Sequence, residues 1–142
     1  MSIIIPTVAV LAYKGNKVLL VKHGEKASHL TGVYGLPGGR INDVETEKEA
    51  ALREFTEETG LTIFGDLIEI PNRYTAEIKR KDGNTKTFSM RVYICKSFSG
   101  ELKRSDETTP GWIKIEELKN YNLLPNIEKA VCDGLSFKAV AK

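Results

Sequence analysis

The chain has 142 residues, of which 41% are hydrophobic and 28% are charged, and we expect residues 1–142 to form a single domain. The 21 basic and 19 acidic side chains leave a formal net charge of +2, which argues against a nucleic-acid partner. The N-terminus lacks the features of a signal peptide, and no apolar run reaches the roughly twenty residues of a membrane span. We therefore expect a cytoplasmic protein without a membrane partner.

The first elements along the chain are a predicted β-hairpin. Residues 7–13 and 17–21 are apolar and β-branched, and the turn residues Gly15-Asn16 lie between them. Such continuous apolar runs predict strands that are largely buried. Residues 23–35 show little periodicity and should form a loop, and residues 36–41 should form a short extended segment. The loop contains His23 and His29, which lack the spacing of a metal-binding pair, so we interpret both as loop residues.

The clearest predicted helix spans residues 47–59. Thr46 is followed three positions later by Glu49, which is the capping-box pattern of a helix N-terminus. Gly60 can end the helix in a left-handed conformation. Ala51 and Phe55 fall on one face at spacing four and should anchor the helix to the core, with Leu52 beside them.

The middle of the chain predicts two further strands. Residues 61–79 alternate in a strand-like way, with interruptions at Gly65 and Pro71, and a turn at residues 82–84 leads into residues 85–96. One face of the second strand should be apolar, with Phe88, Met90, Val92 and Ile94. The basic run at residues 79–81 is more typical of a solvated hairpin turn than of a nucleic-acid site.

The last third of the chain predicts a short strand at residues 112–115 and two helices, at residues 116–120 and 126–139. The apolar side of the last helix should contain Ile127, Ala130, Val131 and Leu135. Strands therefore dominate, with one helix in the middle and others at the end. This order indicates an α/β protein of the α+β type, in which helices cover a mixed sheet.

An acidic cluster lies on the helix at residues 47–59. Glu54 is three residues from Glu57 and four from Glu58, and both spacings bring side chains together on one helical face. Three neighbouring carboxylates repel one another, and a hard cation such as Mg²⁺ or Mn²⁺ would relieve this repulsion. Arg53 lies four residues before Glu57 and can pair with it. A solvated acidic helix face is the simpler interpretation of this short string when it is considered alone.

The surrounding residues favour the metal site. From Gly39 the sequence reads GRINDVETEKEAALREFTEETGL, and it resembles the box motif of the Nudix hydrolase family. Seven fixed positions of that motif match, namely Gly39, Glu45, Arg53, Glu54, Glu57, Glu58 and Gly60. Phe55 stands at a usually aliphatic position, while Asn42 and Val44 depart from the frequent residues of the preceding loop. LPGG before the box and WIKIEEL at residues 112–118 extend the resemblance over nearly the whole chain.

The resemblance implies a fold, a cofactor and a set of site residues. The fold would be an α/β/α sandwich with a mixed β-sheet, the box helix and a C-terminal helix. The cofactor would be Mg²⁺, for which Mn²⁺ can substitute. Its ligands would be Glu54, Glu57 and Glu58 with the carbonyl of Gly39, and the supporting residues would be Glu45 and Arg53.

The implied reaction is attack of water on a phosphorus atom of a nucleoside diphosphate-linked substrate. The catalytic base is left open among Glu54, Glu57 and Glu107. Two residues are candidates for substrate binding. Asn126 stands where MutT-like relatives have an asparagine that recognises a purine, although it can equally cap a helix, and Arg91 can face a cleft from its strand.

A (d)NTP, as in MutT-like pool sanitation, is the expected substrate, because markers of other subfamilies are missing outside the box. ADP-ribose or another nucleotide sugar is the alternative within the family. A non-catalytic domain that senses nucleotides is a second alternative. The sequence does not define the oligomeric state, although a homodimer is compatible with the family.

Overall fold

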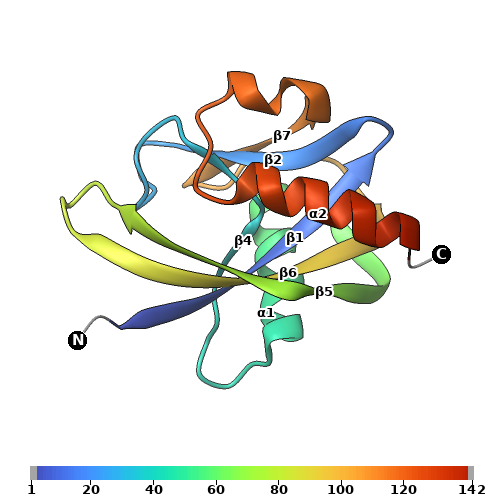
Figure 1. The fold of residues 1–142 in the computed structure, drawn as a ribbon, viewed down its shortest axis with the longest axis horizontal. Helices are drawn as coiled ribbons and strands as arrows, with labels where there is room; N and C mark the ends of the chain where they lie inside the picture. Colours follow the sequence, from blue (N-terminus) through green and yellow to red (C-terminus); the bar gives the residue numbers. More distant parts are fainter. Residues whose placement is uncertain (1–2, 141–142) are drawn as a thin grey trace.

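The computed structural model describes residues 3–140 and has the expected α/β/α arrangement (Figure 1). The strands of the sheet are β1 (Ile4–Lys14), β2 (Lys17–His23), β3 (Tyr34–Gly35), β4 (Gly38–Arg40), β5 (Thr62–Lys79), β6 (Thr85–Ser99) and β7 (Thr108–Lys114). The helices are α1 (Glu47–Thr59), the 3₁₀ helix η1 (Ile115–Asn120) and α2 (Ile127–Val140). No helix in this described part of the chain is long and apolar enough to cross a membrane.

Strand β1 is the centre of the sheet. It pairs in parallel with β6, from Ile4 opposite Thr87 to Ala12 opposite Cys95, and antiparallel with β4. Its end forms the predicted hairpin with β2, where Tyr13 lies opposite Val18. The strand order is β3-β2-β1-β6-β5, with β4 paired to β1 and β7 paired to β2. The expected mixed sheet is therefore confirmed.

Two apolar cores cover the two faces of the sheet. Odd-numbered side chains of β1 lie in one core and even-numbered ones in the other, because successive side chains of a strand point to opposite faces. Leu11 packs with Val131 of α2 in one core, and Val10 packs with Phe55 of α1 in the other. Figure 1 shows α2 crossing the near face of the strands. The box helix is thus fixed to one face and the C-terminal helix to the other.

Helix α1 begins and ends where the sequence predicts. The side chain of Thr46 accepts a hydrogen bond from the amide of Glu49, and the Glu49 carboxylate accepts one from the Thr46 amide. Gly60 ends the helix at φ 80°, a conformation that side chains other than glycine rarely adopt. The boundaries follow from local chemistry, which is why the sequence alone sufficed.

Several boundaries and orientations differ from expectation. Leu52 is 37% exposed because it follows the buried Ala51 by one position, and one residue turns a side chain about 100° around a helix. Leu135 is also 37% exposed. In place of Leu135, Gly134 faces the sheet and lies close to the side chains of β1. Phe137 also packs against this core. Strand β6 extends to Ser99, and β7 begins at Thr108 instead of at residue 112.

The interruptions in β5 are confirmed as irregularities of the sheet. The pairing with β6 shifts register between Phe64 and Leu67, around Gly65, and again between Glu69 and Arg73, around Pro71. Such bulges bend a strand and re-aim its side chains. Beyond the second bulge, Tyr74 lies opposite Met90 and its side chain points towards α2.

Gly38 allows β4 to lie directly on β1, because it has no side chain. A Cβ atom at this position would overlap the carbonyl oxygen of Val8 and lie 2.8 Å from the Cα atom of Ala9. Because both neighbours are backbone, Gly38→Ala should lower the free energy of unfolding by about 1–3 kcal/mol. The matched control is Gly111→Ala in β7, where a Cβ would meet nothing within 4 Å. Chemical denaturation measures both, and equal effects would contradict the close packing of β4.

Candidate active site

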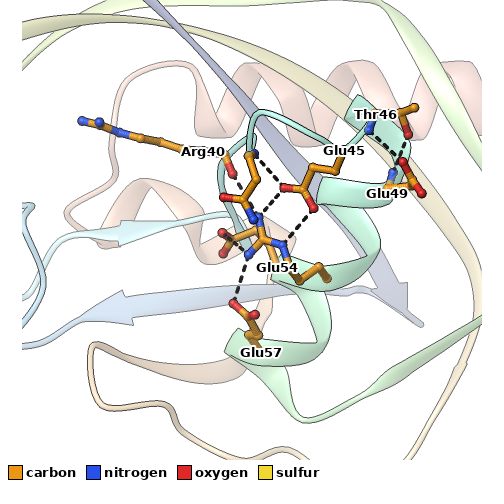
Figure 2. Close-up of polar contacts among 8 residues, drawn as sticks. Arg40, Glu45, Thr46, Glu49, Glu54 and Glu57 are labelled. Carbon is orange, nitrogen blue, oxygen red and sulfur yellow. Dashed lines mark hydrogen bonds and ion pairs between the residues drawn. The ribbon is translucent and has the colours of Figure 1, made fainter.

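Arg53 links the box helix to the loop before it. Its Nε and Nη2 atoms donate to the two carboxylate oxygens of Glu45 at 3.0 and 2.6 Å, and its Nη2 also donates to the carbonyl of Arg40 at 3.2 Å. Such two-pronged bonds fix both direction and distance. These bonds and the bond from the Asn42 amide hold the pKa of Glu45 well below its usual range, at about 2. Figure 2 shows Glu45, Glu54 and Glu57 gathered within this network.

The same guanidinium group contacts two carboxylates of the acidic cluster. Its Nη1 atom lies 3.0 Å from Glu54 and 3.3 Å from Glu57. The predicted pairing of Arg53 with Glu57 is therefore confirmed. The Glu57 side chain is 58% exposed and does not line the cavity described below. Arg53 thus neutralises part of the charge that the helix concentrates on this face.

Glu58 is the most deeply set carboxyl group of the cluster. Its Oε1 atom accepts a hydrogen bond from the Gly38 amide at 2.7 Å, and its Oε2 atom accepts one from the Thr108 hydroxyl at 3.1 Å. Burial raises the pKa of Glu58 to about 7, and the charge of Glu54 adds to this effect. Burial also raises the pKa of Glu54. Two carboxyl groups with a raised proton affinity therefore lie side by side.

Gly39 completes this end of the site. A Cβ atom at Gly39 would lie 2.5 Å from the Cδ atom of Glu54, so a side chain there would displace that carboxyl group. Within residues 3–140 no three acidic, histidine or cysteine side chains are arranged together as a metal site. Mg²⁺ is commonly held by one or two carboxylates, with water and substrate phosphates as its other ligands. Glu54 and Glu58, with the backbone of Gly39, fit that pattern of hard oxygen ligands.

A cavity of about 340 Å³ contains this carboxylate pair. That volume lies within the range of small-molecule sites. Glu107 lines the cavity from the loop before β7, where Ser105 accepts hydrogen bonds from the amides of Glu107 and Thr108. The apolar part of the wall includes Leu36, Ala76, Phe88, Met90, Leu124, Pro125 and Ile127.

The two candidates for substrate binding occupy different places. Asn126 lines the cavity, and its side-chain amide donates to the carbonyl of Thr75 at 3.2 Å. Its φ of 70° is unusual for a residue other than glycine. Arg91 does not line the cavity. It lies against α1 and β5, with a side chain that is 12% exposed and donates to the carbonyls of Ile70 and Pro71.

Other polar cavity residues were interpreted from the sequence as ordinary loop or turn residues. His23 and His29 line the cavity as an edge-to-face pair with ring centroids 4.9 Å apart. Burial lowers the pKa of each to about 4, so both rings are neutral at pH 7. Arg80 also lines the cavity. The alternation of Tyr74, Ala76 and Ile78 along β5 was the available signal for Arg80, because it continues that face.

Comparisons with known proteins agree with the motif. The sequence model of the NUDIX domain matches residues 4–133. An ADP-ribose pyrophosphatase of Methanocaldococcus jannaschii is 32% identical over 139 residues, which cover 94% of this chain and 75% of that protein. An oxidized purine nucleoside triphosphate hydrolase of Danio rerio is 32% identical over 111 residues, which cover 77% of this chain and 65% of that protein.

Solved structures show the same fold. The crystal structure of a MutT protein from Methanosarcina mazei superposes with a TM-score of 0.76 at 24% identity, and it covers 97% of this chain and 96% of that one. A MutT NUDIX hydrolase from Burkholderia pseudomallei gives a TM-score of 0.75 at 22% identity, covering 93% of this chain and 98% of that one. Together with the box carried by α1, these matches establish that the chain belongs to the Nudix family of pyrophosphohydrolases.

Proposed function

We propose that this chain is a Mg²⁺-dependent hydrolase of nucleoside triphosphates, in which Mn²⁺ can replace Mg²⁺. The observation that carries the proposal is the cavity, in which the carboxyl groups of Glu54 and Glu58 share one space with Asn126 and an apolar wall. The carboxylate end suits a cation with its bound phosphates, and the other end suits a nucleobase. The Nudix family is typically dependent on divalent metal ions.

Glu54 and Glu58, with the carbonyl of Gly39, would hold the ion, and Glu57 would be a further ligand next to them. When bound, Mg²⁺ would neutralise phosphate charge and favour the attack of water on phosphorus. Arg53 contacts Glu54 directly and is tied to Glu45, so these two residues act by positioning. Their bonds limit the directions in which the ligand carboxylates can point.

Glu107 is the catalytic base that the surroundings favour. Among the described residues, its carboxylate has no hydrogen-bond donor or ion-pair partner, whereas Glu54 is bonded to Arg53 at 3.0 Å. A carboxylate without such partners is better able to accept a proton from water. Its backbone is fixed by the Ser105 turn and by a bond from the Gly24 amide to its carbonyl.

Asn126 would recognise the nucleobase. Because its nitrogen donates to Thr75, the side-chain oxygen is left as an acceptor for an N–H group of a purine. Tyr74, Met90 and Leu124 contribute to the apolar surroundings on which a base can pack. The fixed orientation of the amide would prefer bases with a donor at that edge.

A second candidate function is hydrolysis of ADP-ribose or another nucleotide sugar. It is favoured by the similarity to the Methanocaldococcus jannaschii protein, which extends over 94% of this chain. Both classes of substrate would place their diphosphate at the carboxylate end of the cavity. They differ in the group beyond the second phosphate, which is a phosphate in one class and a sugar in the other. A direct comparison of substrates therefore decides between them.

A substrate panel tests the proposal. The purified chain would be incubated with dGTP, 8-oxo-dGTP, ADP-ribose and a nucleotide sugar, with Mg²⁺ and then with chelator, in water labelled with ¹⁸O. We expect Mg²⁺-dependent cleavage of a triphosphate, with mass spectrometry locating the label on the attacked phosphorus. Preferred cleavage of ADP-ribose would establish the second candidate. Binding without any turnover would contradict both candidates and indicate a nucleotide sensor.

Glu107 and its neighbour Asp106 provide a matched pair for the catalytic base. Glu107→Gln should lower kcat by about 100-fold with little change in KM, because it removes proton acceptance and keeps the shape of the side chain. Asp106→Asn changes the same charge in the same turn, but Asp106 does not line the cavity, and its kcat should stay within about twofold. Equal kcat values for the two variants would exclude Glu107 as the base and move the role to Glu54 or Glu57.

The raised pKa of Glu58 predicts how stability depends on pH without metal. In the unfolded chain this carboxyl group titrates near 4.5, and in the fold near about 7. The folded protein therefore holds a proton that the unfolded chain releases, and stability falls as pH rises through this window. Between about pH 5 and about pH 8 the loss should be on the order of 1–3 kcal/mol. Glu58→Gln should remove most of this slope in denaturation with chelator present, and an unchanged slope would refute the assignment.

A further inference from the structure

A group of cations lies at the mouth of the cavity and is not used in the mechanism above. Arg40 at the end of β4 and Arg80 just after β5 both line the cavity. An adjoining hollow is lined by these two arginines together with Ser28, Lys81, Asp82 and Lys86. In Figure 2 the Arg40 side chain extends away from the Glu45 network. The mouth is therefore strongly cationic, although the carboxylate pair lines the same cavity.

Neither guanidinium group has a close acidic partner among the described residues, although Asp82 and Glu107 act on Arg80 at longer range. No Asp or Glu oxygen of residues 3–138 lies within 4.0 Å of either group. The Nε atom of Arg80 is buried and has no hydrogen-bond partner among those residues. Burial lowers the pKa of Arg80, and the charge of Arg40 acts in the same direction. A bound anion would relieve both the repulsion and the unpaired donor.

Arg80 is held in place by its surroundings. Its guanidinium carbon lies 5.6 Å from the centroid of the Phe88 ring, and its backbone closes the hairpin turn with Asn84 and Gly83. The next residue, Lys81, donates from Nζ to the carbonyls of Gly24 and Glu25. These two bonds hold the β5–β6 hairpin against the loop that follows β2. A preorganised guanidinium loses less freedom when it binds an anion.

Asn126 and Arg80 line the same cavity from different elements. Asn126 bonds to Thr75, and Arg80 follows Thr75 by five residues along β5. Five extended residues span about 16 Å, so the two side chains lie far apart along the cavity. Glu107 lines the same cavity as Asn126 and Arg80. A base at Asn126 and phosphates at the carboxylate pair would direct the terminal phosphate towards Arg80.

We propose that Arg40 and Arg80 form a subsite for the terminal phosphate of a nucleoside triphosphate and thereby select triphosphates over nucleotide sugars. This inference rests on the proposed function. A terminal phosphate carries the charge and the acceptor oxygens that paired guanidinium groups bind best. The terminal ribose of ADP-ribose is neutral and would leave the two cations unneutralised. The positive charge of Arg40 and Arg80 would therefore favour binding of a triphosphate over binding of ADP-ribose.

Equilibrium binding separates this subsite from the rest of the cavity. The probes are α,β-methylene dGTP and α,β-methylene dGDP, which keep the charges but cannot be cleaved at that link, titrated calorimetrically with Mg²⁺. Arg80→Met removes the charge and keeps an unbranched stem over Phe88. We expect it to weaken triphosphate binding by about tenfold and diphosphate binding by less than about twofold. Lys79→Met removes the same charge from an exposed neighbour that does not line the cavity, and it should change neither affinity.

The outcomes distinguish the failure of the subsite from the failure of the proposed function. Equal weakening of both nucleotides by Arg80→Met, or the same loss in Lys79→Met, would overturn the subsite while the activity panel still holds. Absence of binding by the wild-type chain to either nucleotide would overturn the proposed function itself. Arg80→Lys should recover part of the triphosphate affinity. If Arg80→Met does not fold, Arg40→Met provides the same comparison, because Arg40 is exposed and its loss removes no packing.

Discussion

The carboxyl group of Glu58 is the point on which the rest of the site depends. It accepts hydrogen bonds from the Gly38 amide and the Thr108 hydroxyl, so it joins α1 to β4 and β7. Gly38 can supply its amide only because it lies directly on the backbone of β1. A buried carboxyl group with two donors is stable in the fold, yet its proton affinity is raised. The two hydrogen bonds fix the geometry and favour the ionised carboxylate, whereas burial raises the pKa of Glu58.

A single arginine, Arg53, pairs with the other carboxylates at this end of the site. Arg53 connects Glu45, Glu54 and Glu57, so the charge that would weaken the acidic helix is distributed over one network. Glu45 is the anchor of this network, because it is also bonded to the loop backbone at Asn42. Glu57 is the exposed end, where the interaction with Arg53 is screened by water. The network therefore leaves Glu54 and Glu58, but not Glu57, facing the cavity.

The sequence predicted those features that neighbouring residues determine. The bounds of α1 follow from the capping box at Thr46 and from Gly60, and the bulges of β5 fall at Gly65 and Pro71. The box motif identified the family for the same reason, because its spacing is local. The alternation along β5 indicates the face on which Arg80 lies, but not that this face lines a cavity. The position of Arg80 in the cavity depends on the bond between Lys81 and the loop at Gly24, a contact between residues 57 apart in the chain. Leu135 was assigned to the core from periodicity, although the close approach of Gly134 to β1 turns it outward.

One relative is named an ADP-ribose pyrophosphatase and another an oxidized purine nucleoside triphosphate hydrolase. The box cannot distinguish these substrates, since it holds the part that they share. Discrimination must therefore arise from residues outside the motif that reach the same cavity. The two arginines at the mouth satisfy this requirement, because they come from the end of β4 and the β5–β6 hairpin and lack acidic partners within residues 3–138. The buried Nε of Arg80 has no hydrogen-bond partner among the described residues, and an anionic ligand could supply one. On this proposal the choice of substrate depends on residues outside the box, at the end of β4 and after β5, whereas the box helix supplies the ligands for the metal ion.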